Sequence, residues 1–134
     1  MLALVITGFE ADPSRITEIL GVEPTYTSRA GEPSRTGRPH RKSQWRLSVD
    51  DRMDTYEDHE RFLDILLSRI SGRGARFATM REVVRPESVH IYGGLYVDTE
   101  FQNAIGLTVE QMATLVECRI EWGVDIFDRT SDTG

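Results

Sequence analysis

A chain of 134 residues that is 39% hydrophobic and 28% charged fits one globular domain and excludes a largely disordered polymer. Its single cysteine, Cys118, excludes an internal disulfide and suits a reducing compartment, so we expect a cytoplasmic protein. The apolar opening at residues 2–9 is too short for a secretory signal or a membrane span, and the net charge of −6 argues against a general nucleic-acid-binding surface.

The first half of the chain combines three strands with one short helix. The apolar run 2–9 predicts a buried strand, and an aspartate–proline start with a glycine stop predicts a helix over 12–21. A short strand follows at 26–29, and clean alternation predicts another at 44–49. Between them, residues 30–43 are rich in Gly, Pro, Ser and Arg without hydrophobic periodicity, so they should form an exposed loop.

The second half of the chain is expected to hold two longer helices and three strands. Capping-box sequences predict that the helices begin near Asp54 and at Thr108. Phe77–Val84 and Val89–Val97 have the composition of two strands joined by a short connection, and the alternating segment Ile120–Ile126 predicts the last strand. Four residues of the last helix should face inward: Val109, Met112, Leu115 and Val116.

These elements give the order β-α-β-β-α-β-β-α-β. We therefore expect an α+β fold with a mixed, largely antiparallel sheet of about six strands and about three helices, ferredoxin-like in its first part and extended by a final βαβ-type unit. Alternation places Trp45 and Trp122 on the buried faces of their strands. The expected α+β domain covers residues 1–128, and residues 129–134 should form a polar C-terminal tail.

The segment Ala11–Pro24, with the sequence ADPSRITEILGVEP, resembles the opening signature of an uncharacterised, largely bacterial family, domain of unknown function (DUF) 4279. Shorter similarities follow in the same order at Gly31-Glu32, Ser43–Leu47, Leu107-Thr108 and Asp125–Phe127. The resemblance spans nearly the whole chain. It implies a domain with this order of elements and brings no activity with it.

The segment from Ser28 to Arg46 concentrates positive charge. It holds six basic residues and one acid, Glu32, a local charge of +5, so with a total of −6 the rest of the chain carries −11. The six basic residues are Arg29, Arg35, Arg38, Arg41, Lys42 and Arg46. Such a patch attracts anionic groups through its long-range field, and the alternative is a solvated loop whose charge balances the acidic remainder.

The charge segregation leads us to expect a small non-catalytic interaction module that binds an acidic protein partner through the Arg-rich loop. Phosphate or nucleic-acid binding by the same loop is an alternative, although the negative net charge and the lack of interleaved aromatic residues disfavour nucleic acid. An unpaired sheet edge could also pair with a second copy, so a homo-oligomer is compatible with the sequence, but no residue identifies the edge.

A second alternative is a small-ligand binder or an enzyme that uses a polar cleft on the sheet. His90, Tyr92 and Tyr96 alternate onto one face of their strand, and Glu121 opens the last strand. These four side chains could line such a cleft if the fold gathers them. They could equally form the solvent side of the sheet.

The sequence contains no recognisable motif for catalysis or metal binding. His40, His59 and His90 lack the spacing of zinc ligands, and the acidic run 50–60 lacks the pattern of a calcium loop, so its acids should instead favour the start of a helix. Cys118 could be a nucleophile, but no base is identifiable and packing explains it equally well. We therefore expect no catalytic residues, no metal and no cofactor.

Overall fold

Five strands form one mixed sheet in the computed structural model, which describes residues 1–98 and 105–129. They are β1 (Leu2–Thr7), β2 (Tyr26–Ser28), β3 (Gln44–Val49), β4 (Ser88–Val97) and β5 (Glu121–Asp128). Their spatial order is β2-β3-β1-β4-β5. The pair β4–β5 is parallel and the other three pairs are antiparallel. Strand β1 is the central strand of the sheet.

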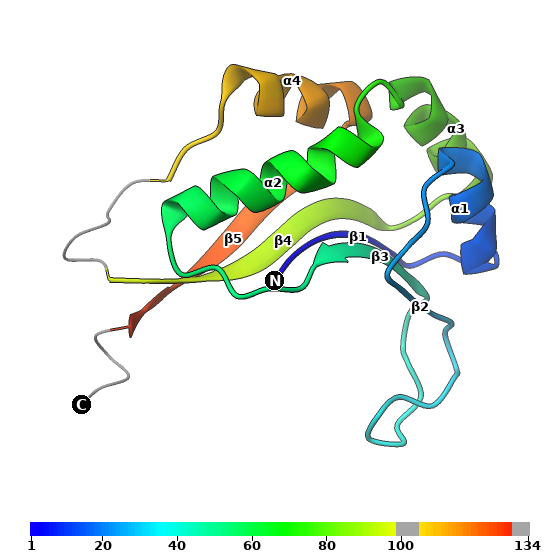
Figure 1. Ribbon diagram of the computed structural model, residues 1–134. Coiled ribbons are helices and arrows are strands. Elements are labelled where there is room, and N and C mark those ends of the chain that lie inside the picture. The colour runs from blue at the N-terminus through cyan, green and yellow to red at the C-terminus, as the bar shows by residue number, and fades with distance from the viewer. Residues whose placement is uncertain (99–104, 130–134) are drawn as a thin grey trace.

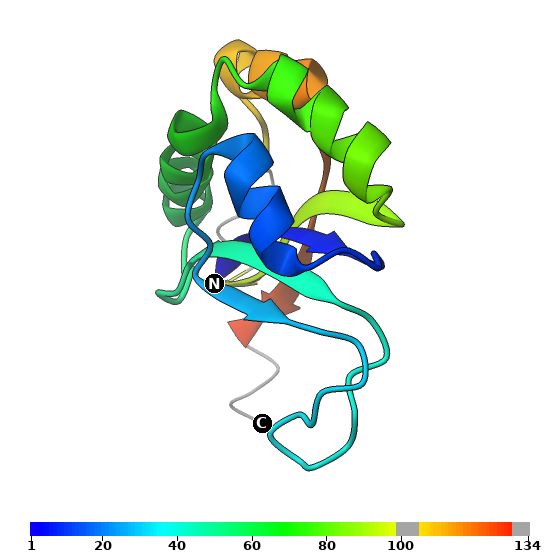
Figure 2. The ribbon, with the colours of Figure 1, turned by 90° about the vertical axis from the view of Figure 1, so that its right-hand side faces the viewer.

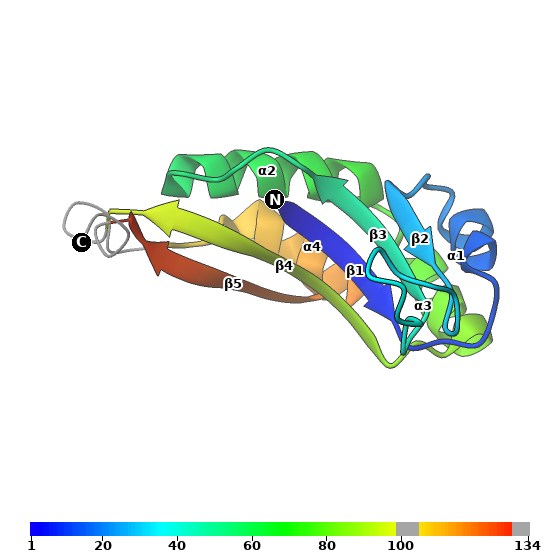
Figure 3. The same cartoon turned by 90° about the horizontal axis from the view of Figure 1, so that it is seen from below.

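Four helices lie over one face of this sheet: α1 (Pro13–Leu20), α2 (Tyr56–Ile70), α3 (Gly74–Val84) and α4 (Val109–Cys118). Figures 1 and 2 show all four on the same side, so the core lies between the helices and the strands. In the described part of the chain no helix covers the opposite face, which Figure 3 shows from below. No described helix has the length and apolar content needed to cross a bilayer.

The connections along the chain account for the order and direction of the strands. The elements from β1 to β4 produce the antiparallel order β2-β3-β1-β4, which is the ferredoxin-like arrangement expected for the first part. After β4, the connection to β5 contains helix α4, which lies in the helical layer, and β5 then runs parallel to β4. A parallel neighbour needs such a crossover because a tight hairpin can only reverse the chain.

The predicted count of six strands and three helices is wrong, because Phe77–Val84 belongs to helix α3 rather than to a strand. Phe77, Met80 and Val84 are the buried residues of α3, and their steps of three and four are helical spacing. The valines near its end have high strand propensity, but Val83 is exposed and does not share the buried face. Arg85, with φ of 53°, ends the helix in the left-handed conformation.

The inward face predicted for the last helix is also wrong for three of its four residues. Val109, Met112 and Val116 are exposed, whereas Leu115 is buried. Helix α4 turns a different face inward, made by Gln111, Leu115 and Cys118. The Gln111 amide N–H donates to the Asp64 carboxylate of α2 at 2.9 Å, which satisfies this buried polar side chain.

Both tryptophans lie on the core side of the sheet, as alternation predicted. Trp45 is fully buried, and its indole N–H donates to the Thr17 hydroxyl of α1 at 3.0 Å. Trp122 is half-buried and packs against the core. Of the predicted tail 129–134, residues 130–134 lie outside the described residues, as do residues 99–104 between β4 and α4.

Candidate functional site

Residues 29–43, here called the arm, connect β2 to β3 and extend away from the sheet on the side opposite the helices (Figures 1 and 2). Four backbone hydrogen bonds of 2.8–2.9 Å hold its two sides together. The innermost links Gly31 to His40, and the outermost closes a turn from Ser34 to Gly37, where φ is 82°. The expected loop is therefore exposed, but hydrogen bonds within it give it a defined hairpin shape.

Two of the six basic residues are paired with acids at the base of the arm. Arg29 lies 3.0 Å from the carboxylate of Asp12, and Lys42 forms an ion pair with Glu87. Hydrogen bonds from Ser14 and, to a lesser extent, the charge of Arg29 lower the pKa of Asp12 below its usual value. All four charged side chains are about half exposed, so these pairs orient the arm while adding little stability.

The other four basic residues divide into two groups. The guanidinium of Arg46 lies 4.6 Å from the ring centroid of Tyr26 and belongs to the sheet rather than to the arm. Arg35, Arg38 and Arg41, here called the arm tip, are exposed. Within residues 1–98 and 105–129, no hydrogen bond, ion pair or ring contact engages these three side chains.

The residues predicted for a polar cleft lie on the helix-free face of the sheet. His90, Tyr92 and Tyr96 line one hollow of about 460 Å³, here called the sheet hollow, together with residues of β1 and β3. Glu121 is in register with His90 but lines a separate depression with Arg119. The fold thus gathers three of the four predicted residues.

Strand register creates the sheet hollow. One row across the sheet runs through Tyr26, Arg46, Val5, His90 and Glu121, because these residues are register partners on successive strands. Partners in one row point to the same face. The small central side chain of Val5 is therefore flanked by long side chains on both sides.

Two features of the sheet hollow were missed by sequence reasoning. Arg46 was grouped with the loop, although it lines the hollow from β3. Ala3 and Val5 form part of the lining, yet their strand was predicted only as an apolar run. The backbones of β1 and β4 approach closely at Gly93, since a Cβ on Gly93 would lie 2.3 Å from the Met1 carbonyl oxygen. The alternation of residues 2–7 between the two faces of β1 could have placed Ala3 and Val5 on the helix-free face. It gave no signal because both faces of β1 are apolar at its centre.

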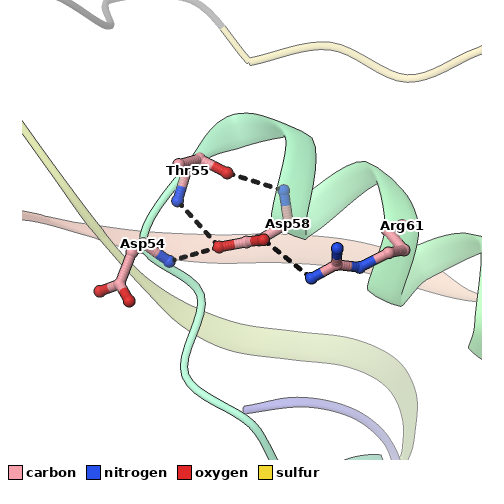
Figure 4. Close-up of polar contacts among 4 residues, drawn as sticks. All are labelled: Asp54, Thr55, Asp58 and Arg61. Carbon is pink, nitrogen blue, oxygen red and sulfur yellow. Dashed lines mark hydrogen bonds and ion pairs between the residues drawn. The ribbon is translucent and has the colours of Figure 1, made fainter.

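Thr55 and Asp58, within the acidic run 50–60, cap helix α2, as Figure 4 shows. The Asp58 carboxylate accepts hydrogen bonds from the backbone N–H groups of Asp54 and Thr55 and from the Arg61 guanidinium. The Thr55 hydroxyl in turn accepts from the Asp58 N–H at 3.0 Å. The acids thus stabilise the positive end of the helix. Within the described residues no cluster of three or more metal-ligating side chains forms.

Cys118 has the environment of a packing residue. It is fully buried, and burial together with the nearby charge of Glu117 raises its pKa from 9.0 to about 11. The adjacent Arg119 does not lower this pKa; the cation that favours the thiolate is Arg81, and its effect is smaller than that of burial. A thiol nucleophile needs the opposite shift, so the geometry gives no support to a catalytic cysteine.

Comparison with known proteins agrees with the resemblance seen in the sequence. The model of the family described as Domain of unknown function (DUF4279) matches residues 1–128. No curated protein and no solved structure matches the chain.

Proposed function

Because this chain belongs to the DUF4279 family, whose description names no function, we propose a role from its own geometry: it is a non-catalytic interaction module that binds an acidic protein partner through the arm tip. The observation that carries the proposal is the set of unengaged guanidinium groups at Arg35, Arg38 and Arg41. The other cations of the loop have partners within the molecule, whereas these three are available to another molecule in the described structure.

The hydrogen-bonded shape of the arm supports this role. A binding loop that is already ordered loses less conformational entropy on association than a mobile one. The ladder between Gly31 and His40 and the turn at Gly37 hold the arm tip away from the acidic body. The charge of +5 on residues 28–46 therefore stays separated in space from the charge of −11 on the rest of the chain.

The chemistry of the arm tip favours carboxylates on a protein. Guanidinium groups bind carboxylates with two parallel hydrogen bonds, which gives orientation as well as attraction. Three such groups are few for a nucleic acid, because proteins that bind one commonly contact about six phosphates or more. The arm also carries no Phe, Tyr or Trp on which bases could stack. We place the interaction in a reducing bacterial cytoplasm, in keeping with the single buried thiol of Cys118.

The test is a fluorescence-anisotropy titration of labelled poly-glutamate with the protein at low and at physiological ionic strength. The triple variant Arg35→Gln, Arg38→Gln, Arg41→Gln should lose most of the binding. The matched control neutralises three exposed arginines on the helical side, Arg15, Arg69 and Arg76, and changes the net charge equally. It should bind like the wild type.

Equal losses in the arm-tip variant and in the control would show that only net charge matters and would remove the proposal. Tighter binding of a single-stranded oligonucleotide than of poly-glutamate, with affinity falling steeply with salt, would assign the arm to nucleic acid instead.

A further inference from the structure

We propose that the sheet hollow binds a small organic carboxylate with an aromatic or apolar body. The hollow lies on the helix-free face, and its lining comes from β1, β3 and β4 rather than from the arm tip. Its volume of about 460 Å³ falls in the range of small-molecule sites. The inference concerns a ligand of this protein's own sheet and does not depend on the partner proposed for the arm.

The floor of the hollow has little side-chain bulk. Ala3 and Val5 lie on the central strand, and Gly94 adds no side chain on β4. Ala3 is in register with Tyr92, and Val5 is in register with both Arg46 and His90. Ala3 and Val5 are only 2% and 9% exposed, because their long neighbours stand around them. Within the described residues the hollow is therefore a consequence of strand register.

One end of the hollow is suited to an anion. Among the described side chains that line it, Arg46 carries the only fixed charge and none is Asp or Glu. The Arg46 side chain is only half-buried, although its Nε is buried without a hydrogen-bond partner in the described structure. A carboxylate would meet the accessible guanidinium nitrogens, and it supplies two acceptors in the geometry that guanidinium prefers. Gln44 and His90 lie in the same lining and add polar groups at this end.

The other end of the hollow is suited to an aromatic or apolar group. The Tyr92 hydroxyl donates to the Asp125 carboxylate, which holds the Tyr92 ring against β5. The Tyr96 ring stacks on Phe127, with centroids 4.9 Å apart and planes inclined by 18°, and the Arg52 guanidinium lies 4.4 Å from its centroid. Phe127 and Arg52 already occupy the Tyr96 ring, so the exposed Tyr92 ring is the aromatic surface left for a ligand. Because Asp125 holds this ring before any ligand arrives, packing against it involves little loss of side-chain freedom.

These two ends define the chemical class of the ligand. A carboxylic acid of modest size would place its anion at Arg46 and its apolar body over Ala3 and Val5, beside Tyr92. A neutral analogue of the same shape lacks the charge-assisted hydrogen bonds and should bind about tenfold or more weakly. A cationic analogue meets Arg46 as a like charge and should not bind.

The experiment is an amide NMR titration of the full chain with 3-phenylpropanoate, 3-phenylpropanol and 2-phenylethylamine. We expect 3-phenylpropanoate to shift the resonances of β1, β3 and β4 and to bind about tenfold tighter than the alcohol. Arg46→Gln should reduce its affinity to that of the alcohol, whereas Arg15→Gln, on the helical side, should leave the affinity unchanged. Ala3→Leu fills the floor and should abolish binding of both compounds; if it unfolds the protein, Tyr92→Ala takes its place and should weaken both.

Equal affinities for the acid and the alcohol, an unaltered affinity in Arg46→Gln, or no binding at millimolar concentrations would overturn the inference. Binding of a peptide with a free C-terminal phenylalanine, but not of the small acid, would assign the hollow to a protein terminus and would also overturn it. The arm-tip variant should bind 3-phenylpropanoate like the wild type, so a failure at the hollow is distinguishable from a failure at the arm.

Discussion

The indole N–H of Trp122 donates to Nε2 of His59 across 3.0 Å, and this bond joins β5 to the first turns of α2. Because an indole nitrogen can only donate, Nε2 of His59 must be the acceptor, and in the neutral ring the proton then lies on Nδ1. The two rings meet edge to face with centroids 5.4 Å apart. His59 is fully buried, and its Nδ1 has no partner among the described residues.

Burial of His59 makes the stability of the protein depend on pH. Burial lowers the pKa of His59 below the value of 6.5 that applies when the chain is unfolded. Between the two pKa values the unfolded state binds the extra proton, so the stability from neutral His59 is complete above 6.5 and is lost as the pH falls toward the folded-state pKa. The slope should reach at most about 1.4 kcal/mol per pH unit.

Urea denaturation at a series of pH values measures this effect, with His59→Gln as the matched variant. Glutamine keeps an acceptor for the Trp122 N–H but does not titrate. The difference in free energy of unfolding between wild type and variant should therefore shrink or reverse as the pH falls below 6.5. A difference that stays constant with pH would show that His59 is not held neutral.

The capping box at the start of α2 should contribute measurably to stability. Thr55→Ala removes the acceptor for the Asp58 N–H and should lower the free energy of unfolding by about 1 kcal/mol. Thr114→Ala is the control, because Thr114 is an interior residue of α4 and alanine has the higher helix propensity. Thermal denaturation of both variants checks the prediction, and equal losses in the two would contradict a specific capping role.

The features predicted correctly from sequence depend on neighbours along the chain. Alternation at Gln44–Val49 identified Trp45 as a core residue, and the aspartate, proline and glycine around α1 placed its ends. Helix α3 was missed because its sequence combines helix-forming residues with strand-forming valines, and Phe77–Val84 is short enough for either period. Packing against α1 and α4 decides between them, and that packing is not encoded locally.

The candidate sites could not be predicted from local sequence patterns, because they depend on which distant segments lie side by side in the fold. No local pattern says that Val5 lies between Arg46 and His90, because strand order and register place them together from segments about 40 residues or more apart. The same holds for the arm, where only the structure separates Arg29 and Lys42, which have acidic partners, from the arm tip. The sequence therefore identified a charged segment but not which of its charges are free.

Cys118 should be chemically protected in the folded protein. A rise in pKa from 9.0 to about 11 lowers the thiolate fraction at neutral pH about a hundredfold, and full burial limits access further. A thiol-reactive chromophore should therefore label the native protein at least about a hundredfold more slowly than the urea-unfolded protein. Rapid labelling of the native chain would show that α4 opens away from α2 and α3.

Two glycines in neighbouring strands should respond very differently to alanine. A Cβ on Gly93 in β4 would lie 2.3 Å from the Met1 carbonyl oxygen and 3.1 Å from the Leu2 Cα, so backbone atoms of the central strand would have to shift. A Cβ on Gly123 in β5 meets nothing within 4 Å. Gly93→Ala should lower the free energy of unfolding by about 1–3 kcal/mol. Gly123→Ala should change it by about 0.5 kcal/mol or less.

Urea denaturation of the two variants tests this contrast, because both replace a glycine with an alanine and differ only in the surroundings of the added methyl group. Since alanine also restricts the unfolded chain, Gly123→Ala could be slightly stabilising, and that sign would strengthen the comparison. A Gly93→Ala protein as stable as Gly123→Ala would mean that β1 and β4 do not approach as closely as the register requires. The floor of the sheet hollow depends on the same close approach, so that result would also remove the geometric basis of the carboxylate site.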